Sequence, residues 1–141
     1  MVVTNDKNIK KVCSFYASDF HLEMIILPYI SDKIRENKEI KIVTENSLKE
    51  SMKVLLSKIN IKNKEEILNI DWENRNIDEV NSNTVLIING TEKFIEEKNE
   101  ELKTNDKNIE IINCFKFEEV KDKMEEIVNE HEKVINSLNS I

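Results

Sequence analysis

Few side chains in this sequence are of the types that carry out covalent chemistry, and they are scattered along the chain. Cys13 and Cys114 each lie within an apolar run, with neither CxxC spacing nor a histidine at a metal-ligand interval. This pattern predicts two buried, reduced thiols and no metal site. His21 and His131 are the two histidines, and neither has a sequence neighbour that would complete a catalytic pair. The sequence therefore contains no positive evidence for an enzyme.

The sequence also lacks the residues of a phosphate-binding loop. A phosphate-binding loop brings backbone N–H groups close to the anion, and it needs glycines together with a Lys beside a Ser or Thr. Gly90 is the single glycine of the chain, so neither a P-loop nor a GxGxxG turn can be present. Asp19, at the start of the first predicted helix, would also repel a phosphate. We expect no nucleotide cofactor, and no other cofactor is indicated.

Apolar runs alternate with helical stripes along the chain, which predicts strands that alternate with helices. Such alternation indicates a three-layer α/β/α fold, in which helices cover both faces of a mainly parallel five-stranded sheet. A chain of 141 residues is long enough for one domain, which we assign to 1–141. The predicted strands span 11–16, 39–44, 67–72, 84–89 and 109–115, and the predicted helices span 20–35, 47–58, 91–103 and 117–140.

Local signals add detail to these elements. Asp19 is the expected N-cap of the first helix, and Ser47 with Glu50 predicts a capping box for the second. Pro28 is expected to kink the first helix or to break it one residue earlier. The strand at 84–89 is the most apolar and is expected at the centre of the sheet, because buried parallel strands are continuously apolar.

One interpretation of the strand ends is a phospho-receiver, in which acidic residues hold a metal beside a phosphoaspartate. It would use Asp19, Asp71, Thr91 and Lys116, which follow or end four of the predicted strands. The connection between the third and fourth strands is too short for a full crossover helix, and the first strand end has no second acid. The receiver-like interpretation therefore ranks third among the functions considered.

The stretch KVCSFYASDFHLEMIILPYISDKIRENKEIKIVTEN at 11–46 resembles the opening of MEDS domains, the methanogen/methylotroph DcmR-type sensory domains. The residues that carry the likeness are Cys13, Phe15 and Tyr16 in the strand, Asp19 and Glu23 in the acidic stretch, Leu27-Pro28-Tyr29-Ile30 in the helix, and Ile42-Val43-Thr44 in the next strand. The chain departs from the family pattern at Lys11, where the family has a histidine, and at Lys33 and Asn37, where glycines are usual.

The resemblance implies a RecA-like/Rossmann-like core that lacks a Walker A loop and that senses small molecules without catalysis. Ligands of open α/β sheets bind beyond the carboxyl ends of the strands. On this interpretation a ligand pocket would combine aromatic faces with short polar side chains. The same residues would otherwise be core or rim packing residues and helix caps. The candidate ligand-binding residues are Tyr16, Ser18, Asp19, His21, Thr44, Asn46, Trp72 and Asn89.

The predicted last helix carries apolar residues at alternating spacings of four and three, as in a coiled-coil seam. Its first half is expected to cover the sheet, and its second half, after Glu130, to reach beyond the core. We therefore predict that the helix at 117–141 forms a homodimer or docks on a signalling partner. The candidate seam residues are Ile127, His131, Val134, Leu138 and Ile141.

Charge and hydropathy restrict the partners further. The net charge of −7 argues against nucleic acid and against anionic membrane surfaces. No apolar run approaches the roughly 18 residues of a spanning helix, and the first residues lack a secretory h-region, so we expect a cytoplasmic protein. The leading function is a non-catalytic sensory domain that relays ligand binding through its last helix. The alternative is a protein–protein interaction module without a ligand.

Overall fold

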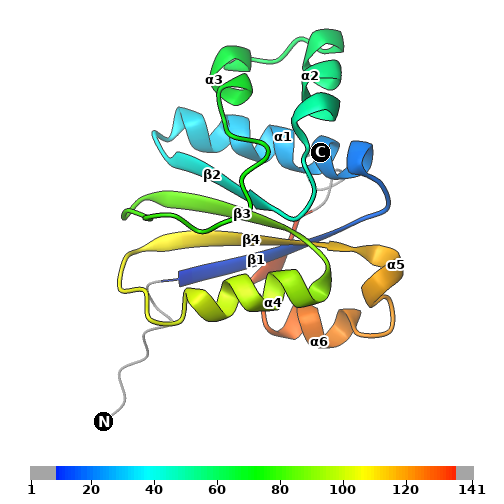
Figure 1. The fold of residues 1–141 in the computed structure, drawn as a ribbon, viewed down its shortest axis with the longest axis vertical. Helices are drawn as coiled ribbons and strands as arrows, with labels where there is room; N and C mark the ends of the chain where they lie inside the picture. The colour runs from blue at the N-terminus through cyan, green and yellow to red at the C-terminus, as the bar shows by residue number, and fades with distance from the viewer. Residues whose placement is uncertain (1–8, 136–141) are drawn as a thin grey trace.

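The computed structural model describes residues 9–135, in which a five-stranded parallel sheet lies between two layers of helices (Figure 1). The strand order is β2-β3-β4-β1-β5 and every pairing is parallel. This architecture confirms the predicted three-layer α/β/α fold and is consistent with a Rossmann-like or RecA-like arrangement. The strands are β1 (Ile9–Tyr16), β2 (Glu39–Thr44), β3 (Thr84–Gly90), β4 (Ile109–Lys116) and β5 (Lys133–Val134).

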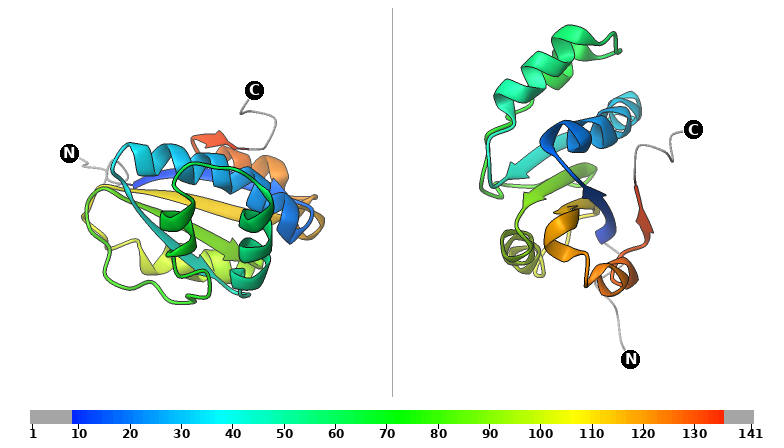
Figure 2. Two further views of the ribbon diagram at one scale, coloured as in Figure 1. Left: turned by 90° about the horizontal axis from the view of Figure 1, so that it is seen from above. Right: turned by 90° about the vertical axis from the view of Figure 1, so that its right-hand side faces the viewer.

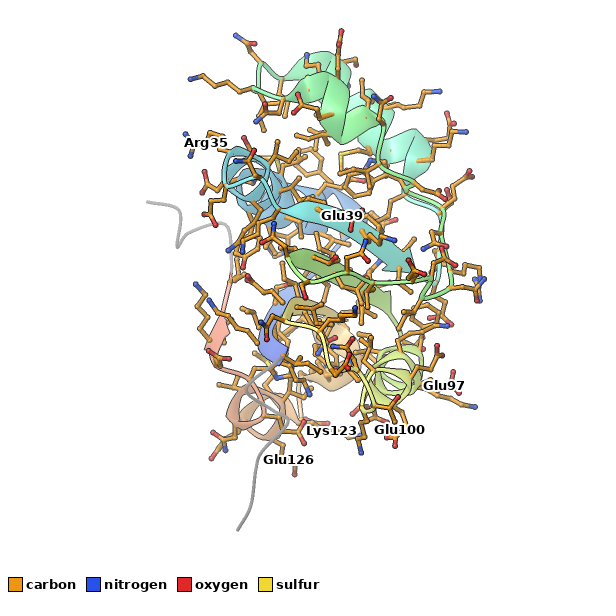
Figure 3. The ribbon with its side chains drawn as sticks, turned by 90° about the vertical axis from the view of Figure 1, so that its left-hand side faces the viewer. Arg35, Glu39, Glu97, Glu100, Lys123 and Glu126 are labelled. Carbon is orange, nitrogen blue, oxygen red and sulfur yellow. The ribbon has the colours of Figure 1, made fainter. Side chains whose placement is uncertain are left out.

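The sheet divides the core into two parts, and helices cover each of its faces (Figure 2). The first core lies under α1 (Asp19–Arg35), α2 (Lys49–Lys58) and α3 (Lys64–Leu68). The second core lies under α4 (Glu92–Glu101), α5 (Phe117–Val120) and α6 (Met124–Asn129). The outward helix faces are charged, as Glu97, Glu100 and Glu126 illustrate in Figure 3.

The strands form where the sequence is mainly apolar, because both faces of this sheet are covered. All seven residues of β3 are buried, although β4 and not β3 takes the middle of the sheet. Successive residues of β1 supply opposite faces, so that Val12 and Tyr16 enter the first core while Cys13 and Phe15 enter the second.

The prediction of a strand at 67–72 is wrong. Helix α3 ends at Leu68 and a turn follows, and neither pairs with the sheet. Ile67 and Trp72 are buried while Leu68 is 40% exposed, and the indole Nε1 of Trp72 donates to the carbonyl of Ile67 at 2.8 Å. A short apolar run satisfies its core contacts equally well in a helical turn as in a strand.

The prediction of one continuous helix at 117–140 is also wrong. The chain forms α5, turns, forms α6, and then adds β5 to the free edge of β1. The imidazole Nδ1 of His131 lies 2.6 Å from the carbonyl of Ile127 and caps the end of α6. The amide of Glu132 then donates to the carbonyl of Lys11 at 2.8 Å. β5 thereby pairs backbone groups along an edge of β1 that would otherwise be free.

The predicted helical seam therefore does not exist in the described part of the chain. Ile127 is buried in the second core, His131 is half-buried against the sheet, and Val134 belongs to β5. Leu138 and Ile141 lie outside the described residues. The expectation that a helix at 117–141 projects from the core is thus contradicted up to residue 135.

Helix starts agree with the sequence only in part. Ser18, and not Asp19, is the N-cap of α1, and Thr91 caps α4. The predicted capping box at Ser47 and Glu50 is wrong: the N-cap of α2 is Leu48, and Ser47 Oγ accepts the amide N–H of Lys49 at 3.2 Å. Helix α1 runs through Pro28 without a break.

The strand order creates a switch point between β1 and β4. The chain leaves β1 into α1 on the first face, whereas it leaves β4 into α5 on the second face. The two strands are paired in register, with Tyr16 opposite Lys116. In open α/β sheets, a crevice for ligands arises at such a point, beyond the carboxyl ends of the strands.

Candidate functional site

Three predicted site residues meet through their side chains at the carboxyl ends of the strands, in one chain of hydrogen bonds that ends on the backbone carbonyl of a fourth, Asn46. The Tyr16 hydroxyl donates to Asn89 Oδ1 at 2.6 Å, and Asn89 Nδ2 donates to Thr44 Oγ1 at 3.1 Å. The Thr44 hydroxyl in turn donates to the carbonyl of Asn46 at 2.6 Å. Tyr16, Thr44 and Asn89 are all buried. The sequence correctly predicted their convergence, but their polar groups are already bonded to one another.

The Tyr16 hydroxyl keeps its proton in this setting. Burial raises the pKa of Tyr16 above its usual range, and the nearby Cys114 and the carboxylates of Asp19, Glu119 and Glu45 raise it further. The residue is therefore a hydrogen-bond donor in the folded protein and not a general base.

The exit from β1 is closed by its own side chains. Ser18 Oγ accepts the amide N–H of His21 at 3.2 Å, and His21 Nδ1 accepts the amide N–H of Ala17 at 2.8 Å. The acceptor role of Nδ1 leaves the ring proton of a neutral His21 on Nε2. Two of the N–H groups at the position of a phosphate loop are thus occupied, and the exposed carboxylate of Asp19 lies beside them.

The exit from β3 holds two carboxylates of this chain. Glu45 Oε1 accepts the amide N–H of Thr91 at 2.8 Å, and Glu119 Oε1 accepts that of Glu92 at 2.6 Å. The first amides of a helix attract anions because they lack intrahelical partners and carry the positive end of the dipole. At α4 two of these amides are already bonded to carboxylates of the protein itself. Sequence reasoning missed Glu45 and Glu119, whose role depends on three segments meeting in space.

Gly90 has a packing role at the same exit. A Cβ atom at this position would lie 2.7 Å from Phe94 Cδ2 and 2.9 Å from the Cβ of Glu45. Both separations are shorter than van der Waals contact. The only glycine of the chain therefore makes room for its neighbours rather than for a phosphate.

The remaining predicted site residues do not extend the group. Trp72 is 3% exposed and belongs to the first core, so its ring offers no free face to a ligand. Asp71, which the receiver-like interpretation requires at a strand end, follows helix α3 instead. Within residues 9–135 no group of three or more His, Cys, Asp or Glu side chains could hold a metal ion.

The cysteines are buried and free, as predicted. Burial raises the pKa of Cys13 to about 11 and that of Cys114 to about 12. Both thiols are therefore protonated near neutral pH and are poor nucleophiles.

Three large apolar side chains remain exposed at or near this edge of the sheet. Phe20 is 61% exposed on the first turn of α1, Met24 is 39% exposed one turn further, and Phe117 is 39% exposed directly after β4. The right panel of Figure 2 looks onto this edge, where the start of α1 and the helix α5 flank the ends of β1 and β4. We call Phe20, Met24 and Phe117 the edge patch.

Comparison with known proteins adds no relative. No family model, no curated protein and no solved structure matches this chain significantly. The fold and the edge define the class, an α/β domain of Rossmann-like or RecA-like arrangement with self-capped strand exits. In the part of the chain from 9 to 135, no helix is both long and apolar enough to cross a membrane.

Proposed function

We propose that this domain is a non-catalytic module that binds another protein through the carboxyl-end edge of its sheet. The observation that carries the proposal is the closed chain from Tyr16 through Asn89 to Thr44. These buried groups satisfy one another, and a small ligand would have to break their bonds in order to use them.

The helix ends at this edge support the same conclusion. Ser18 and His21 accept two of the amides around the start of α1, and Glu45 and Glu119 accept two at the start of α4. An anionic ligand would compete with these internal acceptors and meet the repulsion of two carboxylates. Recognition of a phosphate or a carboxylate at this edge is therefore disfavoured.

The edge patch offers exposed apolar side chains that a protein partner could bury. Aromatic side chains and Met are enriched at protein interfaces, where a few of them carry most of the binding energy. A partner would cover Phe20, Met24 and Phe117 with its own apolar side chains. It would not add a strand at β2, because the amide of Thr44 already donates to the carbonyl of Asn74 at 2.8 Å, and Asn74 Nδ2 donates to the carbonyl of Ile42 at 3.0 Å.

A double variant of the edge patch tests the proposal. Phe20→Ser with Phe117→Ser removes two exposed rings without touching either core, and Val54→Ser is the matched control because Val54 is 53% exposed on α2. A photo-crosslinking residue at position 20 of the wild-type domain should give a discrete protein adduct in extract of the source cells. The double variant, crosslinked from position 24, should lose that adduct, whereas Val54→Ser should keep it.

Two results would refute this function. One is a partner that is captured equally by the wild type and the double variant, and the other is the absence of any protein adduct from position 20. An adduct with a second copy of the domain, together with a concentration-dependent mass, would identify the partner as the chain itself. Circular dichroism establishes that each variant is folded.

The second candidate is the small-molecule sensory domain suggested by the resemblance to MEDS domains. A concave region at the other end of the sheet favours it, as described below. If a ligand instead binds among Tyr16, Thr44 and Asn89, a saturating metabolite should stabilise the domain by about 2.7 kcal/mol at a concentration a hundredfold above its Kd. The variant Tyr16→Phe should alter that stabilisation. If no metabolite of a broad panel changes the melting temperature of the domain, the hypothesis of a ligand site among these residues is refuted.

A further inference from the structure

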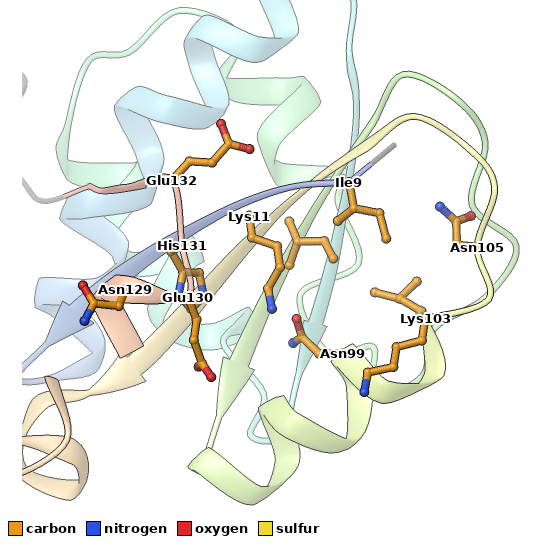
Figure 4. Close-up of a pocket in the computed structure, with 11 residues that line it drawn as sticks. Ile9, Lys11, Asn99, Lys103, Asn105, Asn129, Glu130, His131 and Glu132 are labelled. Atoms are coloured by element: carbon orange, nitrogen blue, oxygen red, sulfur yellow. The ribbon is translucent and has the colours of Figure 1, made fainter. Parts of the chain in front are cut away.

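A pocket lies on the second face of the sheet, near the amino ends of β1 and β4 and far from the edge patch (Figure 4). It opens between the end of α4 and the turn that follows α6, and its volume is about 670 Å³. Pockets of about 300–1,000 Å³ are typical of small-molecule sites. Its apolar floor is formed by Ile9, Leu102 and Ile111.

One wall of the pocket is a rigid polar network. The side-chain amides of Asn99 and Asn113 bond each other twice, at 2.9 Å and 3.2 Å, and Asn99 Nδ2 also donates to the carbonyl of Ile95 at 2.8 Å. Asn113 Nδ2 lies 3.0 Å from His131 Nε2. These bonds hold Asn99 and His131 in place without a ligand, which is the preorganisation that small-molecule recognition requires.

Lys11 is a charged residue on an otherwise apolar face of β1. It lies on the face of β1 that also carries Ile9, Cys13 and Phe15, all of which pack in the second core. Its ammonium has no hydrogen-bond or ion-pair partner among residues 9–135. Figure 4 shows its Nζ directed into the pocket toward Asn99. Lys11 is partly exposed at this wall, and its unpaired positive charge would attract an anion that enters the pocket.

Glu130 provides the opposite charge on another wall. It lies in the turn after α6, lines the pocket, and has no ion-pair partner within the described residues. Lys103, the other cation of the lining, already pairs with Glu100 at 3.1 Å. Glu132 also lines the pocket without an ion-pair partner among the described residues, but Figure 4 shows its carboxylate directed away from Lys11 Nζ. The pocket thus presents one unpaired cation, the unpaired carboxylate of Glu130 and an apolar floor.

We propose that this pocket binds a small aliphatic zwitterion of the α-amino acid class. The ligand carboxylate pairs with Lys11, the ligand ammonium pairs with Glu130, and the aliphatic side chain covers Ile9, Leu102 and Ile111. A dianion would be repelled by Glu130 and a simple amine by Lys11, so a ligand with both charges fits best. This site is separate from the edge patch and goes beyond the proposed protein-binding function.

Titration with L-leucine, L-isoleucine and L-valine, followed by calorimetry and by NMR, tests the proposal. At least one of the three should bind saturably and should shift the side-chain amide signals of Asn99 and Asn113. The variants Lys11→Met and Glu130→Gln should each weaken binding at least about tenfold, because each removes one charge-assisted bond. Lys62→Met is the matched control, since Lys62 is exposed in the loop between α2 and α3, and it should bind as the wild type does.

Two fragment probes test the zwitterion itself. 4-Methylpentanoate lacks the ammonium of leucine and 3-methylbutylamine lacks the carboxylate, so both should bind at least about tenfold more weakly than leucine. Equal binding of 4-methylpentanoate, or unchanged binding by Lys11→Met, would overturn the assignment. So would the absence of saturable binding by all three amino acids. The Phe20→Ser, Phe117→Ser variant should still bind leucine, so failure at one site is distinguishable from failure at the other.

Discussion

Tyr16 and Asn89 are joined by a 2.6 Å hydrogen bond that reaches across the end of β4. The two residues end β1 and β3, which are not neighbours in the sheet, and β4 lies between them. The bond therefore spans the place where the strand order changes direction. In open α/β folds this place usually receives a ligand, and here it is closed by the chain's own side chains.

The Tyr16–Asn89 bond should contribute measurably to stability. Tyr16→Phe leaves the buried Oδ1 of Asn89 without its donor, which costs about 1–3 kcal/mol in the free energy of unfolding. Urea denaturation monitored by circular dichroism measures this loss. Tyr29→Phe is the control, because the Tyr29 hydroxyl is buried without a partner, and its removal should be neutral or stabilising. Equal losses in the two variants would contradict the assigned role of the bond.

Gly90→Ala should destabilise the domain through overpacking. The added methyl group would meet Phe94 and Glu45 at distances under 3 Å, and the expected loss in the free energy of unfolding is about 1–3 kcal/mol. Phe94→Leu makes room on one side, so the double variant should lose less than the sum of the two single variants. Additive losses, measured by urea denaturation, would show that the contact with Phe94 is not the cause.

Glu23 should make stability fall as pH rises. It is buried on α1 and its partner is the Ser51 hydroxyl. Burial raises the pKa of Glu23, the Ser51 bond lowers it by less, and Asp19 raises it further. The folded state then binds more protons than the unfolded state between the ordinary pKa of about 4.3 and the raised value. The free energy of unfolding should therefore decrease with increasing pH across that window.

Glu23→Gln removes this dependence, because its amide can still bond Ser51 without a charge. The variant should be more stable than the wild type at pH 7 and lose that advantage as the pH falls toward 4. Urea midpoints across this range measure the difference. Glu50→Gln, on the exposed face of α2, is the control, and the same change in both variants would refute a role for the buried carboxylate.

His131 should make stability fall as pH drops. Burial lowers the pKa of His131 and Lys11 lowers it further, while the bond to the carbonyl of Ile127 and the charge of Glu130 raise it by less. The folded protein holds a neutral ring with its proton on Nδ1, because Nε2 faces the Asn113 amide group. The unfolded state binds more protons below the ordinary pKa of about 6.5, so stability present above that value is lost as the pH falls toward the lowered pKa.

Two measurements check the His131 assignment. Nitrogen NMR of the ring should show the Nδ1–H tautomer at pH 7.5 and a titration midpoint below 6.5. His131→Gln should flatten the decline of the urea midpoint between pH 7 and pH 5. A titration midpoint above the ordinary histidine value would refute the assignment.

The four long strands could be predicted from the sequence because each of them is mainly apolar. Thr84–Gly90 is buried throughout, and no other element of this length places apolar side chains on both sides of the chain. The predicted closeness of Tyr16, Thr44 and Asn89 followed from the same reasoning, since the carboxyl ends of parallel strands share one edge. The absence of a phosphate loop followed from composition alone, because Gly90 has no second glycine beside it.

Only the tertiary structure determined the helical turn at 67–72, the strand β5 and the bonding of the polar groups at the strand ends. The apolar run at 67–72 fits a helical turn or a strand equally well, and only the core around Ile67 and Trp72 selects the helix. The two residues of β5 are too few to show a period, and their pairing depends on the free edge of β1. Whether the polar groups at the strand ends stay open or bond one another depends on strand order. That order brings Tyr16 to Asn89, 73 positions away, and local propensity cannot determine it because the contact is made only after the sheet assembles.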